Sequence, residues 1–487
     1  MGIERVRSYI DQSKVTQFLR RAFASYFFPF VTAAVIAACY MLALDIVAIW
    51  YLCICATAIL VCCKDVSPAL CILIFFQIFV SIKHCPSTFS TGVGSDYFFA
   101  TPILAQEIIA VAFVAFALVA RTIDGIVKHR FVITRPFWGI VILSVALLFN
   151  GSFYTSYSAR GLLYGFGLGA ILIFTFVFTC GNVEIDKNFF VRISLIMLAL
   201  CASLSLQLIY VYCTIDGLVV EGVVNRALLF LGWGTYNNLG MLFTICIPAW
   251  FYLAGRTKYG FAFLLGAALN IVACFLSMSR QAMMMSVIVA ILCCIWIILR
   301  TKGIQRIINA SVIGGVLLIV IICCAVMHEK FAYFFSSILI SLSTGSGRTP
   351  LWNTSINNFF KKPLFGVGFF DKNASYNVVG YFGEDITNFI PRLSHNTIFQ
   401  FMSSCGLTGL LAYLYHRAQT IVSLINNFSH ERILIGLILA AFLLCCLLDC
   451  YIFYFLPTAI YAFFVAILAI TESKNKKSVG ADKVLEV

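Results

Sequence analysis

A histidine and an asparagine stand side by side where a polar segment meets a long apolar run, in SHNTIFQFMSSCGLTGLLAYL at residues 394–414. A neutral imidazole can accept a proton from an attacking hydroxyl group, and the positive end of a helix that begins here would disfavour the protonated ring. We therefore predict that His395 acts as a general base and that Asn396 orients its ring or binds a substrate hydroxyl. The alternative is that both side chains only cap the helix.

Three arginines could bind an anion close to this histidine. Arg280 stands in a tight turn between two apolar runs, where the next helix would add the positive end of its dipole. Arg226 lies in the loop EGVVNRALLFLGWGTYNNLG, which is expected on the outer face, and Arg348 ends the glycine-containing stretch GSGR. Because guanidinium groups hold phosphates in two-pronged contacts, we predict that all three bind a diphosphate. Each could instead be a surface charge that reaches lipid headgroups.

The composition is that of a polytopic membrane protein. Of the 487 residues, 62% are hydrophobic and only 11% are charged, and the mean hydropathy is +1.00. Apolar runs long enough to cross a bilayer recur along the chain, among them 67–82 and 396–415. We therefore expect an all-α fold with about 12–14 transmembrane helices, each needing about 20 apolar residues.

Basic residues set the expected topology. Lysines and arginines gather in alternate connections and at both termini, which places the termini in the cytoplasm under the positive-inside rule. Topology thus accounts for the net charge of +13, and no nucleic-acid partner is implied. The expected organisation is a helical bundle over 1–327, an outer loop over 328–395, further spans over 396–471 and a cytoplasmic tail over 472–487.

The outer loop is expected to contain short amphipathic helices. Apolar residues recur at helical spacing in FAYFFSSILISL, residues 331–342. Thr349-Pro350 predicts a second helix start. An apolar stripe on that second helix is predicted for Trp352, Ile356, Phe359 and Phe360. The glycines and proline of KKPLFGVGF should end it.

Neither a metal nor a cofactor is expected. Most of the 20 cysteines lie inside apolar runs, where cysteine serves as a small hydrophobic residue. No cluster has metal-ligand spacing, and no nucleotide-binding motif or large cytoplasmic domain is recognisable. Any activated donor should therefore be attached to a lipid and reached from the outer leaflet.

Two stretches resemble the signature region of the O-antigen ligase/polymerase family. They are SGRTPLWNTSINNFFKKPLFGVGF (346–369) and residues 394–414. In that family an SGR-like start precedes a tryptophan, a PL-G-G turn and a His-Asn pair that opens the next span. The matching positions here are Ser346, Gly347, Arg348, Trp352, His395 and Asn396. The SMSRQA turn around Arg280, and Arg226 ahead of it, resemble the family's other two arginines.

The resemblance implies an inverting, metal-independent glycosyltransferase whose donor is a glycan linked to undecaprenyl diphosphate. Arg226 and Arg280 would neutralise the diphosphate, and His395 would deprotonate or orient the acceptor hydroxyl. Arg348 would line the site or contact phosphate. The acceptor would be another glycan or a lipid-linked repeat, on the outer face of the bacterial cytoplasmic membrane. Further partners would be membrane lipids, a chain-length regulator and a flippase.

Several functions remain open within and beyond this family. A polymerase is slightly favoured over a ligase because nothing in the sequence looks built to dock a lipid A core, and a protein O-oligosaccharyltransferase is a third member type. A flippase for lipid-linked glycans is the alternative outside the family, although it should carry charges through the bilayer centre. A scaffold role predicts that substitutions of the arginines and the histidine are silent.

Overall fold

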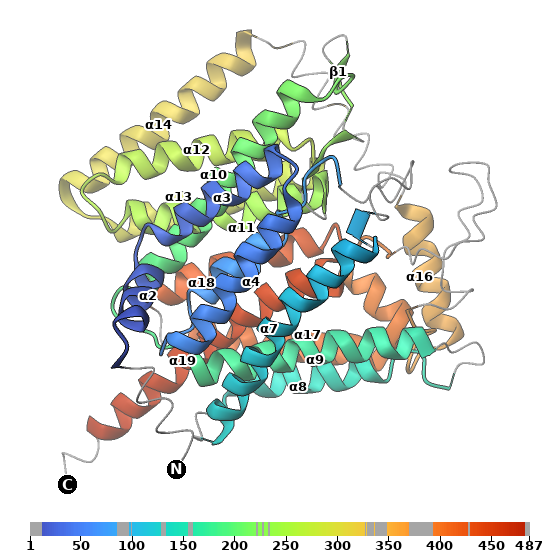
Figure 1. The fold of residues 1–487 in the computed structure, drawn as a ribbon. Coiled ribbons are helices and arrows are strands. Elements are labelled where there is room, and N and C mark those ends of the chain that lie inside the picture. The colour runs from blue at the N-terminus through green and yellow to red at the C-terminus, as the bar shows by residue number, and fades with distance from the viewer. Residues whose placement is uncertain are drawn as a thin grey trace. The chain divides into compact units, whose positions relative to one another are not determined.

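The described residues fold mainly into α-helices, which confirms the predicted all-α polytopic architecture (Figure 1). This computed structural model describes residues 12–84, 97–98, 100–127, 133–153, 159–220, 223–225, 228–231, 234–326, 328, 336, 348–369, 393–426 and 429–482. Contacts divide the chain into two units, each described by itself. Unit 1 comprises Met1–Phe131 and Gly181–Ile313, and unit 2 comprises Val132–Cys180 and Gly314–Val487.

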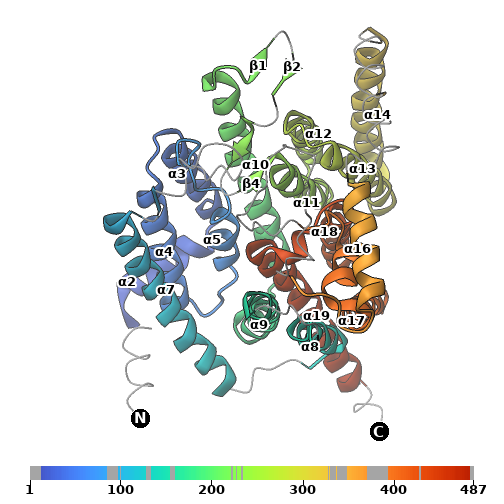
Figure 2. The ribbon, with the colours of Figure 1, turned by 90° about the vertical axis from the view of Figure 1, so that its right-hand side faces the viewer.

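Unit 1 is built from apolar helices around α10, which packs against both α3 and α11 (Figure 2). Its helices are α2 (Lys14–Ala24), α3 (Phe28–Met41), α4 (Asp45–Cys62), α5 (Ala69–Phe75), α7 (Thr101–Val127), α10 (Phe189–Thr214), α11 (Tyr236–Ala254), α12 (Gly260–Leu276) and α13 (Arg280–Arg300). Two short antiparallel pairs of strands lie between α10 and α11: β1 (Val219–Val220) with β2 (Val223–Val224), and β3 (Phe230–Leu231) with β4 (Gly234–Thr235). The helix α14 (Gly303–Val326) then leads into unit 2.

Unit 2 combines an early pair of helices with the C-terminal part of the chain. Its elements are α8 (Arg135–Leu148), α9 (Ala159–Asn182), α16 (Thr349–Lys361), α17 (Thr397–Ile425), α18 (His430–Cys446), the short 3-10 helix η3 (Tyr451–Phe453) and α19 (Phe455–Asp482). The most extensive packing in this unit is between α17 and α8 (Figure 2).

Within the described parts of the chain, nine helices are long and apolar enough to cross a membrane, or up to ten if the bent pair α2–α3 counts as one span. The nine are α4, α7, α9, α10, α11, α13, α14, α17 and α19. Two shorter apolar helices, α8 and α12, accompany them. The number lies below the twelve to fourteen expected partly because the apolar run 67–82 forms only the seven-residue α5, too short to span a bilayer.

Helix α17 is broken at Gly406, whose backbone angles are φ 62° and ψ −153°. Four backbone hydrogen bonds of 2.6–3.1 Å repair the break: from the amides of Val367 and Gly368 to the carbonyls of Ser403 and Ser404, and from the amides of Leu407 and Thr408 to the carbonyls of Pro363 and Leu364. Each unpaired backbone group in hydrocarbon would cost several kcal/mol. The PLFGVG turn after α16 therefore acts as the missing partner of the broken helix.

Two glycines allow the PLFGVG turn to lie close to the break in α17. A Cβ atom on Gly366 would lie 2.5 Å from the carbonyl oxygen of Ser403, and one on Gly406 would lie 2.6 Å from the amide nitrogen of Gly366. Both glycines also have positive φ values, which side chains disfavour. The glycines of the predicted signature thus have a packing role.

The break also brings together side chains that lie far apart along α17. The rings of Phe401 and Tyr413 stack with centroids 4.7 Å apart, whereas twelve residues of continuous helix would separate them by about 18 Å. The chain therefore bends sharply at Gly406, and residues 407–425 form the longer of the two parts of α17. The span predicted over 396–415 falls within α17, which continues to Ile425, so Arg417 lies inside the helix.

Helix α16 begins at Thr349 with Pro350 in its first turn, as predicted. The predicted apolar stripe is only partly correct, because Phe360 is 73% exposed and the buried residues are Ser355 and Asn358. The Asn358 amide donates a hydrogen bond of 3.2 Å to the Ser403 hydroxyl, so α16 meets the broken helix through polar groups. The helix predicted over 331–342 lies outside the described residues except for Ser336.

Candidate functional site

His395 is paired with a buried carboxylate. Its Nδ1 lies 3.1 Å from Oδ1 of Asp449. The Asp449 side chain is 5% exposed, and that of His395 is 37% exposed. A carboxylate can only accept hydrogen bonds, so Nδ1 of His395 is the donor in this pair, and in a neutral imidazole the lone pair then lies on Nε2. A neutral imidazole held in this way can accept a proton at Nε2.

The sequence analysis did not identify Asp449. It lies in the connection between α18 and α19, and its Oδ1 also accepts a hydrogen bond of 2.8 Å from the amide of Cys450. Burial alone would raise the pKa of Asp449, but His395, the guanidinium of Arg348 and the Cys450 amide together hold this pKa below its ordinary value. The carboxylate is therefore ionised at neutral pH. A lone aspartate between two long apolar runs was the available signal.

The backbone of His395 has φ 52°, in the left-handed region that residues other than glycine rarely adopt. The preceding Ser394 is fixed by three hydrogen bonds: its amide donates to Oε1 of Gln400 at 2.7 Å, its hydroxyl donates to the carbonyl of Asn396 at 2.8 Å, and its carbonyl accepts from Nε1 of Trp352 at 3.1 Å. Such a conformation persists only when its surroundings impose it, and it is common at functional sites.

Asn396 supports the site without touching the imidazole in the contacts observed. Its Oδ1 caps α17 by accepting hydrogen bonds from the amides of Ile398 and Phe399, at 2.9 and 3.2 Å. Its Nδ2 donates to the carbonyl of Leu447 at 2.8 Å, at the end of α18. Thr397 Oγ1 donates a further hydrogen bond of 3.2 Å to the Asp449 carbonyl. These two bonds connect the start of α17, next to His395, with the chain around Asp449.

Two predicted site residues on α16 lie near this pair. Trp352 stacks on Phe399 with ring centroids 5.5 Å apart, in addition to its hydrogen bond to Ser394. Arg348 occupies the N-cap position of α16, is partly exposed and interacts electrostatically with Asp449. Unit 2 therefore brings together His395, Asn396, Arg348 and Trp352.

Arg280 belongs to unit 1, where it is the first residue of α13 and partly exposed. The Ser279 hydroxyl caps this helix by accepting from the Ala282 amide at 3.3 Å, and it donates to Oδ1 of Asn237 at 3.0 Å. A guanidinium at a fixed helix N-terminus suits an anionic ligand. Its participation beside His395 stays a prediction.

The remaining predicted site residues, Arg226, Ser346 and Gly347, lie outside the described residues. In the part of the chain that the structure describes, no group of three or more histidine, cysteine, aspartate or glutamate side chains could hold a metal ion.

Part of the chain that contains these residues matches a known protein family. Residues 262–414 match the O-antigen ligase family model. The match confirms the resemblance to the O-antigen ligase family inferred from the sequence. This O-antigen ligase region includes Arg280, Arg348, Trp352, His395 and Asn396, and it ends before Asp449. No curated protein matches the chain.

Proposed function

We propose that the protein is a glycosyltransferase of the O-antigen ligase/polymerase type, which moves a glycan from undecaprenyl diphosphate to a hydroxyl group of an acceptor glycan. The observation that carries the proposal is the His395–Asp449 pair, whose histidine lies in the region that matches the O-antigen ligase model. The multi-pass helical fold suits a donor held in a bilayer. The protein would work in the bacterial cytoplasmic membrane, with both termini in the cytoplasm and the site on the outer face.

In the proposed reaction, the acceptor oxygen attacks the anomeric carbon of the donor from the side opposite the diphosphate. The hydroxyl proton passes to Nε2 of His395 as the new C–O bond forms. The ionised Asp449 stabilises the imidazolium that results, because its carboxylate already accepts the Nδ1 proton. A base placed in this way contributes about 10²- to 10⁴-fold to a rate.

The leaving group departs with the electrons of the broken C–O bond and gains negative charge. Arginine side chains fixed near it would stabilise that charge in the transition state. Arg280 is suited to this role by its place at the start of α13, and Arg348 by its place beside the His395–Asp449 pair. Arg226 completes the proposed set of diphosphate-binding residues. No metal ion or cofactor enters the proposed chemistry.

A deletion strain tests this function and separates its variants. Surface and lipid-linked glycans would be compared after restoring wild-type protein or the His395→Ala variant. Single repeats where long chains normally occur would identify a polymerase, which we favour slightly. Complete chains stranded on undecaprenyl diphosphate would identify a ligase. For either activity, a chain-length regulator and a flippase are proposed as further partners. Full rescue by His395→Ala would refute the proposed base.

A further inference from the structure

The N-terminal helix α2 turns sharply away from the helix that follows it. The axes of α2 and α3 differ by 81°, with a break of only three residues between them. Helix α3 is apolar throughout, with Pro29 in its first turn, whereas α2 is strongly amphipathic. Where the apolar α3 enters the bilayer along its normal, α2 lies at nearly a right angle to it and so runs along the membrane surface.

One face of α2 is fixed to unit 1. Thr16 and Phe23 are buried, and Phe23 meets Phe28 of α3 edge-to-face with ring centroids 5.1 Å apart. The Arg20 side chain donates a hydrogen bond to the carbonyl of Cys62 at the end of α4. These contacts hold the elbow between α2 and α3 in place.

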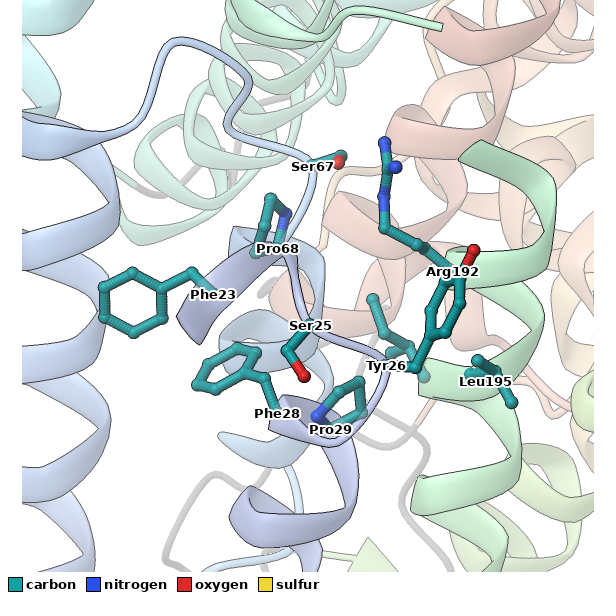
Figure 3. Close-up of a pocket in the computed structure, with 10 residues that line it drawn as sticks. Phe23, Ser25, Tyr26, Phe28, Pro29, Ser67, Pro68, Arg192 and Leu195 are labelled. Atoms are coloured by element: carbon teal, nitrogen blue, oxygen red, sulfur yellow. The ribbon is translucent and has the colours of Figure 1, made fainter. Parts of the chain in front are cut away.

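The elbow borders a shallow hollow whose lining residues are shown in Figure 3. Its walls are largely aromatic or apolar: Phe23, Tyr26, Phe28, Pro29, Pro68, Leu195 and Ile196. The charge of Arg192 in this hollow is balanced by Asp186 at 2.9 Å and Asp65 at 3.3 Å. The hollow therefore suits hydrocarbon better than an anion.

The opposite face of α2 combines apolar and basic side chains. Val15 is 64% exposed and Phe18 is 69% exposed, and they lie on one side of the helix. Lys14 and Arg21 are exposed beside them, and α2 contains no acidic residue. This is the pattern of a helix that lies in the interface of a membrane rich in anionic lipids.

We propose that α2 is an in-plane anchor that binds anionic phospholipids of the leaflet next to the N-terminus. Lys14 and Arg21 would contact the lipid phosphates, and Val15 and Phe18 would insert between the upper parts of the acyl chains. Charge complementarity selects the occupant, because the exposed charges of α2 are all positive. The inference does not depend on the proposed glycosyl transfer.

Amide hydrogen exchange of the full-length protein in nanodiscs tests the proposal. Protection of the α2 amides would be compared in phosphatidylcholine alone and in phosphatidylcholine with one third phosphatidylglycerol. We expect anionic lipid to increase protection, and the double variant Lys14→Gln/Arg21→Gln to lose about 25-fold of it, since each basic side chain near an anionic surface contributes about fivefold. Phe18→Ser should lower protection in both bilayers.

The matched control is Lys258→Gln, which removes an exposed positive charge from the connection between α11 and α12. This variant should leave the exchange of α2 unchanged. Equal protection of α2 in both bilayers, unaffected by the Lys14→Gln/Arg21→Gln change, would overturn the proposal. The same holds if inorganic phosphate added to phosphatidylcholine nanodiscs reproduces the effect, because the ligand would then be a free anion.

Discussion

Replacing Asp449 with asparagine removes one negative charge and little else. The amide oxygen of the new side chain can still accept hydrogen bonds from His395 Nδ1 and from the Cys450 amide, as Oδ1 of Asp449 does now at 3.1 and 2.8 Å. The imidazole should therefore keep its orientation. What the variant loses is the stabilisation of the imidazolium that forms as the acceptor hydroxyl is deprotonated.

The size of this loss follows from the geometry. Two unit charges about 4 Å apart interact by about 4 kcal/mol at an effective dielectric constant of about 20. Because the His395 side chain is 37% exposed, solvent screening reduces this figure. With the interaction roughly halved to about 2 kcal/mol, turnover should fall about 30-fold.

The assay is release of undecaprenyl diphosphate from a lipid-linked glycan donor by purified protein in nanodiscs, a readout that polymerases and ligases share. Asp216→Asn is the matched control, since Asp216 is exposed in the connection after α10. That control should retain wild-type turnover. If Asp449→Asn also turns over within twofold of wild type while remaining folded, the pairing of the two residues has no catalytic role and the reasoning fails.

Three further predictions concern the fold that supports the site. Gly406→Ala should destabilise the protein by about 1–3 kcal/mol or more, because the backbone of Gly406 lies in a region almost restricted to glycine and the new methyl group would meet Gly366. Gly314→Ala, with open space around it, should leave the thermal midpoint in detergent unchanged or slightly higher. Tyr461→Phe should lower that midpoint by the equivalent of about 1–3 kcal/mol, because the Tyr461 hydroxyl is the partner of both His416 Nε2 and the buried Arg417. The partly exposed Tyr415 provides the control Tyr415→Phe, and equal midpoints for the two phenylalanine variants would argue against the buried cluster. Finally, the depressed pKa of Asp449 means that its ionised form adds stability above the ordinary aspartate pKa of about 3.9 and loses it as the pH falls toward the lower pKa of the folded state. The difference in thermal midpoint between wild type and Asp449→Asn should therefore shrink below pH 4, as scans from pH 5 to pH 3 would show; a constant difference down to pH 3 would contradict it.

Sequence reasoning reached the features that short stretches of chain determine. The apolar runs predict helices, Thr349-Pro350 marks the start of α16, and the polar pair at 395–396 marks the start of α17. Each of these depends on residues within one or two helical turns. The match to the O-antigen ligase region follows from the same local motifs.

Features that depend on contacts between distant residues could not be predicted from the sequence. Asp449 is 54 residues from His395 along the chain, and no local pattern links the two. The break at Gly406 requires backbone partners from the PLFGVG turn, so a continuous apolar run gave no sign of it. For the same reason the polar residues Ser355 and Asn358, rather than the apolar stripe, form the buried face of α16.

Long-range contacts also bury His416 and Arg417, two polar residues that follow the span predicted from the sequence. The sequence interpretation ended a span at residue 415, which would leave His416 and Arg417 near the cytoplasm. With the helix broken at Gly406, Arg417 is buried within α17 and stacks between the rings of Tyr413 and Tyr461, 4.5 and 4.7 Å from their centroids. Aromatic faces thus stabilise a charge that would be costly in lipid.

The central claim, that His395 is the base of a glycosyl transfer, is tested most directly by the His395→Asn variant. Asparagine tolerates the left-handed backbone that His395 adopts, so the fold should survive, but its amide cannot take up the acceptor proton. The measurement is release of undecaprenyl diphosphate from the lipid-linked donor, with the thermal midpoint recorded in parallel. We predict an unchanged midpoint and a turnover lower by about 10²- to 10⁴-fold. Turnover within threefold of wild type would contradict the account.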